Sequence, residues 1–260
     1  MPTVPRPARR RGRARIAALT ASAALALGLS GCTSLHTVTP ASERGHASAK
    51  VLMADQPVDC RKAKCIALTF DAGPSKHTPQ LLKILKEKKV HATFFLLGKN
   101  HIERYPKLVT RISEEGHEVA EHTWSHRRLT DLSAKEVREE LSRTQNAVKD
   151  LTGKEPTLMR PPQGRTSDEV SKICKEFGIA QVLWSATAKD YATTDSKLIE
   201  KRILDQSGRD GVILLHDLYD GTVPAVPHLI DALRAKGYTF VTVPELMAPG
   251  APKPGEVYRP

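Results

Sequence analysis

The chain has 260 residues, of which 40% are hydrophobic, 27% charged and 5% aromatic, and its formal net charge is +11 at pH 7. This length allows one substantial domain with appendages, and the apolar fraction is enough to build a core. Six arginines lie before residue 32 with no acid among them, so the remaining chain carries only +5. No basic run is interleaved with aromatic residues, and we therefore expect no nucleic-acid partner.

The first 31 residues have the pattern of an export signal. A basic segment is followed by an apolar stretch, 16–29, which is shorter than the roughly 20 residues that a membrane-spanning helix needs. It closes with the sequence LSGC, which resembles the lipobox of bacterial lipoproteins and predicts acylation of Cys32. The protein would then be anchored to the outer face of the cytoplasmic membrane. The alternative is an ordinary secretory signal with a chance cysteine, and the choice between Sec and twin-arginine export stays open.

The rest of the chain divides by composition into three parts. Residues 32–58 are rich in Ser, Thr, Ala and Pro and predict a polar tether, 59–247 predict the folded domain, and 248–260 form a Pro/Gly-rich tail. Cys60 and Cys65 lie just before the first expected strand, and export favours a disulfide between them over a metal site. Cys174 lies on an apolar helical face and predicts a buried free thiol.

From residue 65 onward, short apolar runs alternate with segments of helical spacing. Apolar residues recur with helical period over 105–112, 137–151 and 226–233, and the second of these begins with a capping box at Ser133 and Glu136 and ends at Gly153. Strands alternating with helices imply parallel crossovers, hence an α/β barrel or an open doubly wound sheet. The expected strands are 66–70, 92–96, 118–121, 157–159, 180–184, 212–215 and 239–241.

Ionisable residues follow most of these expected strands. In a parallel barrel the carboxyl ends of all strands lie on one rim, where active sites are built. Chance would spread such residues over both rims and the helix faces. The sequence therefore predicts one site at this rim, formed by Asp71, His122, His126, Arg160, Asp190 and His216.

The segment HTWSH is the expected metal half-site. If it forms one helical turn, His122 and His126 project from the same face and can reach one ion. An exposed helical pair of histidines is the alternative interpretation. Two histidines rarely suffice, so a carboxylate and water ligands are also expected. Asp71 is the nearest candidate, because Glu121 points to the opposite side of its strand.

The motifs TFDAGP, HTWSH, RPPQG, LWSATAKDY and LLHD, in this order, resemble those of the NodB-type polysaccharide deacetylases over residues 60–246. The resemblance implies a distorted (β/α) barrel of about seven strands. It also implies a divalent metal, commonly zinc, with cobalt as an alternative. The implied activity is removal of N-acetyl groups from chitin-like polymers or peptidoglycan, or of O-acetyl groups from xylan.

The resemblance also implies roles for single residues. Asp71 matches the general base, Arg160 its ion-pair partner, and the two histidines of HTWSH the metal ligands. His216 matches the general acid, and Asp190 the carboxylate that orients it.

Three further positions match the oxyanion and substrate site. The backbone N–H of Gln163 would stabilise the oxyanion, Leu214 would line the pocket for the acetyl methyl group, and Tyr191 would form part of the sugar site. Gln163 stands where the family usually has tyrosine, and Tyr191 where it usually has tryptophan. The walls of the sugar site should therefore differ from those of typical members.

The first motif departs from the family at a metal ligand. Ala72 stands where the family carries a second aspartate, which binds the metal. Metal affinity should therefore fall, or Asp71 must turn to the ion, in which case another group acts as the base.

Two hypotheses follow from these motifs. Taken singly, Asp71 could be a turn residue, Arg160 a structural ion pair and His216 a core histidine, but together they favour a metal-dependent polysaccharide deacetylase. The rival is a catalytically silent, lipid-anchored module that binds cell-wall glycan or a protein partner. Ala72 supports that rival, whereas the low aromatic content counts against a surface that stacks on sugars.

Overall fold

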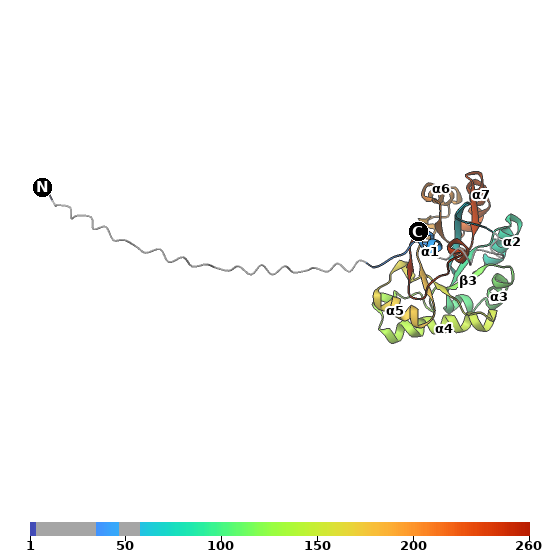
Figure 1. Cartoon of the computed structure of the whole chain (residues 1–260), viewed down its shortest axis with the longest axis horizontal. Helices are drawn as coiled ribbons and strands as arrows, with labels where there is room; N and C mark the ends of the chain where they lie inside the picture. Colours follow the sequence, from blue (N-terminus) through green and yellow to red (C-terminus); the bar gives the residue numbers. More distant parts are fainter. Residues whose placement is uncertain (4–34, 47–57) are drawn as a thin grey trace. The chain divides into compact units, whose positions relative to one another are not determined.

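The computed structural model describes residues 1–3, 35–46 and 58–260, and Figure 1 draws the others as a thin grey trace. The export signal and the predicted lipidation site at Cys32 lie outside the described residues. In the described part of the chain, no helix is both long enough and apolar enough to cross a membrane.

The described residues form one parallel sheet of nine strands in the order β6-β7-β1-β2-β3-β4-β5-β9, with β8 paired to β1 beside this path. The order has two ends, β6 and β9, and the sheet is surrounded by helices (Figure 1), so the expected distorted (β/α) barrel is confirmed. The strands are β1 Lys64–Gly73, β2 Thr93–Leu96, β3 Glu118–Glu121, β4 Leu158–Met159, β5 Ala180–Val182, β6 Ala186–Thr187, β7 Gly211–His216, β8 Tyr238–Val241 and β9 Val257–Tyr258.

All seven expected strands are present, but the expected number was too low. Strands β6 and β9 contain two residues each and were not predicted. Two residues by themselves are too few to show the alternating or continuous apolar pattern on which strand prediction depends, and the equally short β4 was identified only as part of the run 157–159.

The helices cover the outside of the sheet. Figure 1 shows α2 and α3 on one side, α4 and α5 along another, and α6 and α7 on a third. Helix α4 begins with the expected capping box of Ser133 and Glu136 and ends at Gly153, which has a left-handed φ of 74°. The helices are α1 Pro40–His46, α2 Thr78–Lys88, α3 Pro106–Glu114, α4 Ala134–Thr152, α5 Asp168–Glu176, α6 Ser196–Gln206, α7 Thr222–Ala235 and α8 Val243–Met247.

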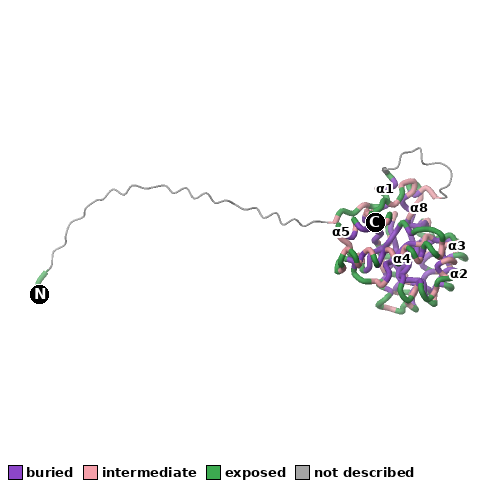
Figure 2. The backbone as a smooth tube through the Cα atoms, turned by 90° about the horizontal axis from the view of Figure 1, so that it is seen from below, coloured by how far each residue is buried: buried purple, intermediate pink, exposed green. Residues whose placement is uncertain are grey.

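The main core lies between the sheet and this layer of helices. Phe70 and Ile213 from the strands pack with Leu82 of α2 and Leu229 of α7, and all four side chains are fully buried. Figure 2 shows the buried segments inside and the exposed ones along the outer turns. Each such side chain contributes on the order of 2 kcal/mol through removal of apolar surface from water.

The two ends of the expected domain differ from the sequence interpretation. Val38 lies in the expected tether, yet its N–H donates to Val257 of β9 (2.9 Å) and its carbonyl accepts from Arg259 (2.8 Å). Arg44 of α1 forms an ion pair of 2.9 Å with Asp210, and its side chain is only 4% exposed. Residues 35–46 therefore pack on the domain, and the expected tail contains a strand of the sheet. Composition predicted neither, because it does not show which residues these segments contact.

Of the three cysteines in the described residues, two form a disulfide. Cys60 and Cys65 are linked, as the sequence suggested, in the turn that leads into β1. The Arg209 guanidinium donates to the carbonyls of Cys60 (2.9 Å) and Arg61 (2.8 Å), which fixes this turn against the start of β7. Cys174 is a buried free thiol, as expected.

Candidate active site

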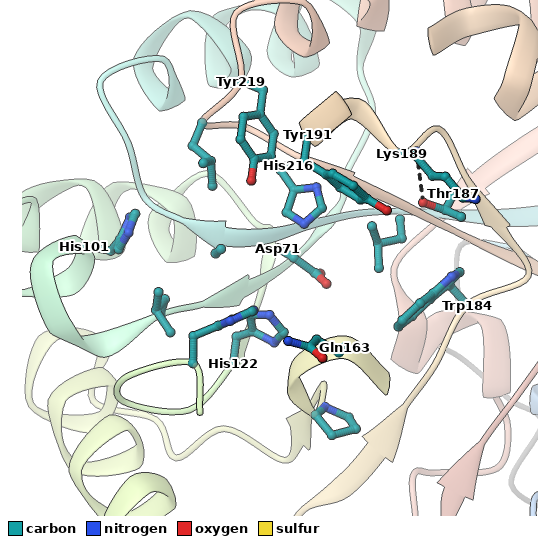
Figure 3. Close-up of a pocket in the computed structure, with 16 residues that line it drawn as sticks. Asp71, His101, His122, Gln163, Trp184, Thr187, Lys189, Tyr191, His216 and Tyr219 are labelled. Atoms are coloured by element: carbon teal, nitrogen blue, oxygen red, sulfur yellow. Dashed lines mark hydrogen bonds between the residues drawn. The ribbon is translucent and has the colours of Figure 1, made fainter. Parts of the chain in front are cut away.

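A cavity of about 710 Å³ opens at the carboxyl ends of the strands, the rim at which the sequence predicted a site. Seven of the predicted site residues line it, and Figure 3 labels five of them around the opening, Asp71, His122, Gln163, Tyr191 and His216. They are Asp71, His122, His126, Gln163, Tyr191, Leu214 and His216. The other two, Arg160 and Asp190, are buried behind this lining, where each contacts one of its members.

Asp71 and Arg160 form a buried ion pair at the end of β1. Arg160 Nη1 lies 2.6 Å from Asp71 Oδ1, and the side chains are 0% and 2% exposed. The same guanidinium donates to Thr69 Oγ1 (2.7 Å) and, through Nε, to the carbonyl of Val182 (2.9 Å). It also lies over the ring of Phe95 at 4.1 Å. Arg160 is thus fixed on several sides and holds the Asp71 carboxylate in one orientation.

His216 and Asp190 form a second pair at the end of β7. His216 Nδ1 lies 2.8 Å from Asp190 Oδ1, and the His216 backbone N–H donates to Asp190 Oδ2 (2.7 Å). Thr222 Oγ1 donates to the same Oδ2 (2.8 Å). Burial alone lowers the pKa of His216, but the hydrogen bond and charge of Asp190 outweigh it, so the pKa is raised above its ordinary value. Asp190 therefore favours the protonated form of this imidazole.

His122 and His126 come together, but not through the expected helical turn. Residues 122–126 are irregular, and both Thr123 (φ 67°) and His126 (φ 60°) have left-handed backbone conformations. The two rings nevertheless lie with centroids 4.8 Å apart. His122 Nδ1 is 2.7 Å from the carbonyl of Arg160, so Nδ1 carries the proton. Nε2 is then unprotonated, and its lone pair is free to bind a metal ion.

The two imidazoles have the chemistry of metal ligands, although the described residues place no third protein ligand beside them. Burial lowers the pKa of His122 to about 4 and also lowers that of His126, so both rings are neutral at pH 7. Ala72 lines the cavity with only a methyl group. Within residues 1–3, 35–46 and 58–260, no group of three or more His, Cys, Asp or Glu side chains is placed to hold a metal ion. The donor set thus fits a two-histidine site rather than a three-ligand zinc centre.

Gln163 lines the cavity in an unusual backbone conformation. Its φ of 59° is left-handed, and its side-chain Oε1 accepts from Arg128 Nε (2.6 Å) at the surface. Among the described residues, no acceptor pairs with the Gln163 backbone N–H. An unpaired backbone N–H in a residue that lines the cavity is the kind of donor that an oxyanion requires.

The cavity also contains residues that the sequence interpretation missed. His101 lies in the short turn η2 (Gly98–Ile102), with Nδ1 3.1 Å from the carbonyl of Pro74. Tyr219 lies three residues beyond His216, with ring centroids 5.3 Å apart. The rule that identified the site, polar residues after strands, would have found Tyr219 if it had been applied to the whole loop after β7, whereas His101 depends on the irregular turn after β2. Further residues that line the cavity are Leu97, Trp184, Thr187, Lys189 and Leu218.

Comparison with known proteins points to one family. A model of the polysaccharide deacetylase family matches residues 59–182. The peptidoglycan-N-acetylmuramic acid deacetylase PdaC of Bacillus subtilis is 40% identical over 184 residues. That alignment covers 70% of this chain but only 38% of PdaC, so the chain spans well under half the length of this curated relative.

Solved structures agree with this comparison. A structure titled T48 deacetylase with substrate has a TM-score of 0.74 and 37% identity, and the match covers 78% of this chain and 100% of that one. A mutant of a Bacillus anthracis pseudoenzyme of the CE4 family, described as having restored enzymatic activity, has a TM-score of 0.68 and 26% identity, covering 76% of this chain and 70% of that one. On the family model, these identities and the shared fold, the chain belongs to the polysaccharide deacetylase family.

Proposed function

We propose that this protein is a deacetylase that hydrolyses acetyl groups on peptidoglycan sugars at the cell surface. The observation that carries the proposal is the pairing of Asp71 with Arg160 and of His216 with Asp190 on two adjacent strands that face one cavity. One pair supplies a fixed carboxylate, and the other an imidazole whose protonated form is favoured by its carboxylate partner. Amide hydrolysis requires these two groups together: a base for water and an acid for the leaving amine. Removal of O-acetyl groups from a polymer such as xylan would use the same groups.

The proposed reaction consumes one water for each acetyl group. Asp71 accepts a proton from the water, whose oxygen attacks the acetyl carbonyl carbon. The N–H of Gln163 donates to the oxyanion that forms. His216 then gives its proton to the sugar nitrogen as the C–N bond breaks, which releases acetate and a free amine. Leu214 lines the cavity and would contact the acetyl methyl group.

Metal dependence is part of the proposal. His122 and His126 would hold a divalent ion, with zinc as the expected metal and cobalt as an alternative. A bound ion would polarise the acetyl carbonyl and lower the pKa of the attacking water. Because the chain supplies two histidines and only a methyl group at Ala72, we expect weaker binding than at a three-ligand zinc site.

The proposed location is the outer face of the cytoplasmic membrane, through lipid at Cys32. Five residues separate Cys32 from Val38, where the chain is already paired with β9. Five residues extend at most roughly 18 Å, so the domain would stay close to the membrane. If the tether had instead run from Cys32 to Cys60, it could have extended more than roughly 80 Å, at about 3.3–3.6 Å per residue.

A second function, a catalytically silent glycan-binding or protein-binding module, is favoured by one observation. Ala72 leaves the site without a third metal ligand, and the chain resembles a family pseudoenzyme of which an active mutant has been described. The retained Asp71–Arg160 and His216–Asp190 pairs argue against this alternative, because binding alone requires neither a base nor an acid.

Acetate release tests the two functions. The purified protein, stripped with chelator, is incubated with N-acetylglucosamine oligomers, peptidoglycan and acetylxylan in the presence of zinc, cobalt or no metal. Metal-dependent release from at least one substrate supports the deacetylase and identifies its polymer. Binding of the same glycans without release, and without stoichiometric metal binding, would establish the silent module instead.

A further inference from the structure

The loop that carries the two cavity histidines adopts a backbone conformation that its own sequence does not favour. Thr123 and His126 are left-handed at φ values of 67° and 60°, and neither is glycine. Such conformations are unfavourable for residues other than glycine and persist only where surrounding contacts over-determine them. Among the described residues, the only hydrogen bond within the loop is one of 3.2 Å from the His126 N–H to Thr123 Oγ1, so contacts from outside the loop must fix it.

Helix α4 supplies that contact through Glu140. The Ser125 backbone N–H donates to Glu140 Oε2 (2.7 Å), and the Ser125 hydroxyl donates to Glu140 Oε1. Both carboxylate oxygens therefore bind the residue directly before His126. Neither oxygen faces the cavity, since Glu140 is not among its lining residues.

Glu140 is an unusual residue for its position. It is 8% exposed and lies on the buried face of α4 beside Val137 and Leu141. An apolar side chain there would extend the core, whereas a buried carboxylate is costly unless its hydrogen bonds are satisfied. A second buried carboxyl group, Glu121, lies close enough for Glu140 to raise its pKa, which burial already raises well above the ordinary value. Among the described residues, the hydrogen bonds from Ser125 are the only favourable contacts that the Glu140 carboxylate makes.

The middle of the loop is clamped independently of Glu140. Trp124 lies against Gly98, where an added Cβ would come within 2.1 Å of the indole ring, and the Arg143 guanidinium lies 4.1 Å from the ring centroid. The Lys99 N–H donates to the Trp124 carbonyl (2.7 Å). These contacts hold Trp124 in place. The hydrogen bonds from Ser125 to Glu140 then fix the backbone between Trp124 and His126.

We propose that Glu140 is a positioning residue for His126. By binding Ser125 through both oxygens, it holds the left-handed turn that directs the His126 ring toward His122. His122 has a separate anchor, the carbonyl of Arg160, and so should not depend on Glu140. This inference rests on the proposed function only in giving His126 the role of a metal ligand. The effect of Glu140 on the position of His126 requires neither metal nor substrate.

The test compares Glu140→Gln with Glu139→Gln, an exposed carboxylate one residue away on the same helix. Glutamine keeps the shape of Glu140, but it is neutral and has a single acceptor oxygen, so the two charge-assisted hydrogen bonds from Ser125 cannot both remain. Three measurements are made on the whole purified protein: zinc affinity by calorimetry, kcat and KM for acetate release, and the ring ¹H–¹³C NMR signals of His122 and His126 in the metal-free protein at one fixed pH.

We expect Glu140→Gln to shift or broaden the His126 signal while the His122 signal stays in place. Zinc affinity and kcat should fall about tenfold to a hundredfold, as is common when a group that orients a ligand is lost, and Glu139→Gln should match the wild type. If Glu140→Gln lowers the melting temperature but leaves the His126 signal and zinc affinity as in Glu139→Gln, Glu140 is merely structural and the proposal is wrong.

Two further provisions keep the test decisive. Where Glu140→Gln does not fold, Ser125→Ala removes one of the two hydrogen bonds and should produce a smaller change of the same His126 signal. An unchanged signal in that variant counts against the proposal. The metal-free NMR measurement also separates this inference from the proposed function, since it gives the same answer whether or not the protein turns over substrate.

Discussion

Asp71 and His216 are directly paired residues on two neighbouring parallel strands, β1 and β7. Each has its own buried partner, Arg160 for Asp71 and Asp190 for His216. Because the sheet register fixes their separation, a carboxylate and an imidazole line the same cavity without any movement of loops. This relationship makes the chemistry of the site depend on the core of the protein.

His216 is expected to be essential for turnover but not for binding. In His216→Ala the leaving amine loses its proton donor, so kcat should fall about 10²- to 10⁴-fold, the usual range for loss of a general acid. Glycan affinity, measured by calorimetry with N-acetylglucosamine oligomers, should change little. A wild-type protein with no turnover to lose would instead support the binding module.

Restoring a carboxylate at position 72 should strengthen the metal site. The Ala72 methyl group lines the cavity, and its left-handed φ of 59° is one that aspartate tolerates better than most residues. Ala72→Asp should therefore bind zinc at least about tenfold more tightly by calorimetry, with His126→Ala in the same background abolishing the gain. Equal zinc affinity in Ala72→Asp and wild type would show that position 72 does not reach the ion.

The pH dependence of turnover should report the pair of His216 with Asp190. Since Asp190 raises the pKa of His216, the protonated acid persists to higher pH than an unpaired imidazole would allow. Turnover should fall as the pH rises through that raised pKa. Asp190→Asn should move this alkaline limb to lower pH by about one unit or more. An alkaline limb in the same place for both proteins would mean that another group is the acid.

The parts of the site that could be predicted from the sequence are those attached to strands. Asp71 and His216 follow long apolar runs, so their strands and their shared rim could be identified from sequence alone. The loop between His122 and His126 could not, because its left-handed residues are held by Glu140, fifteen positions further along. A helical turn was the natural prediction from spacing alone.

Short elements and loops account for the other differences. Strands β6 and β9 are too short to leave a pattern, and Val38 pairs with a strand more than two hundred residues away in the sequence. His101 reaches the cavity through an irregular turn whose Asn100 has a φ of 66°. Contacts of this kind depend on tertiary structure, which propensity and periodicity do not encode.

Acid should destabilise the fold through His117, which lies outside the active site. Burial, with a further contribution from His91, lowers the pKa of His117 to about 4, and its Nδ1 accepts a hydrogen bond from the Ala92 N–H (3.2 Å) that protonation would break. The folded-state pKa lies below the unfolded value of roughly 6.5, so the unfolded state binds more protons between these values, and stability is lost as the pH falls from about 6.5 to 4. The full loss attributable to this group is about 3 kcal/mol. Urea unfolding at a series of pH values measures it: His117→Gln should flatten the dependence over this range, whereas the exposed control His228→Gln should keep it. If His117→Gln retains the wild-type slope, other buried groups cause the acid sensitivity.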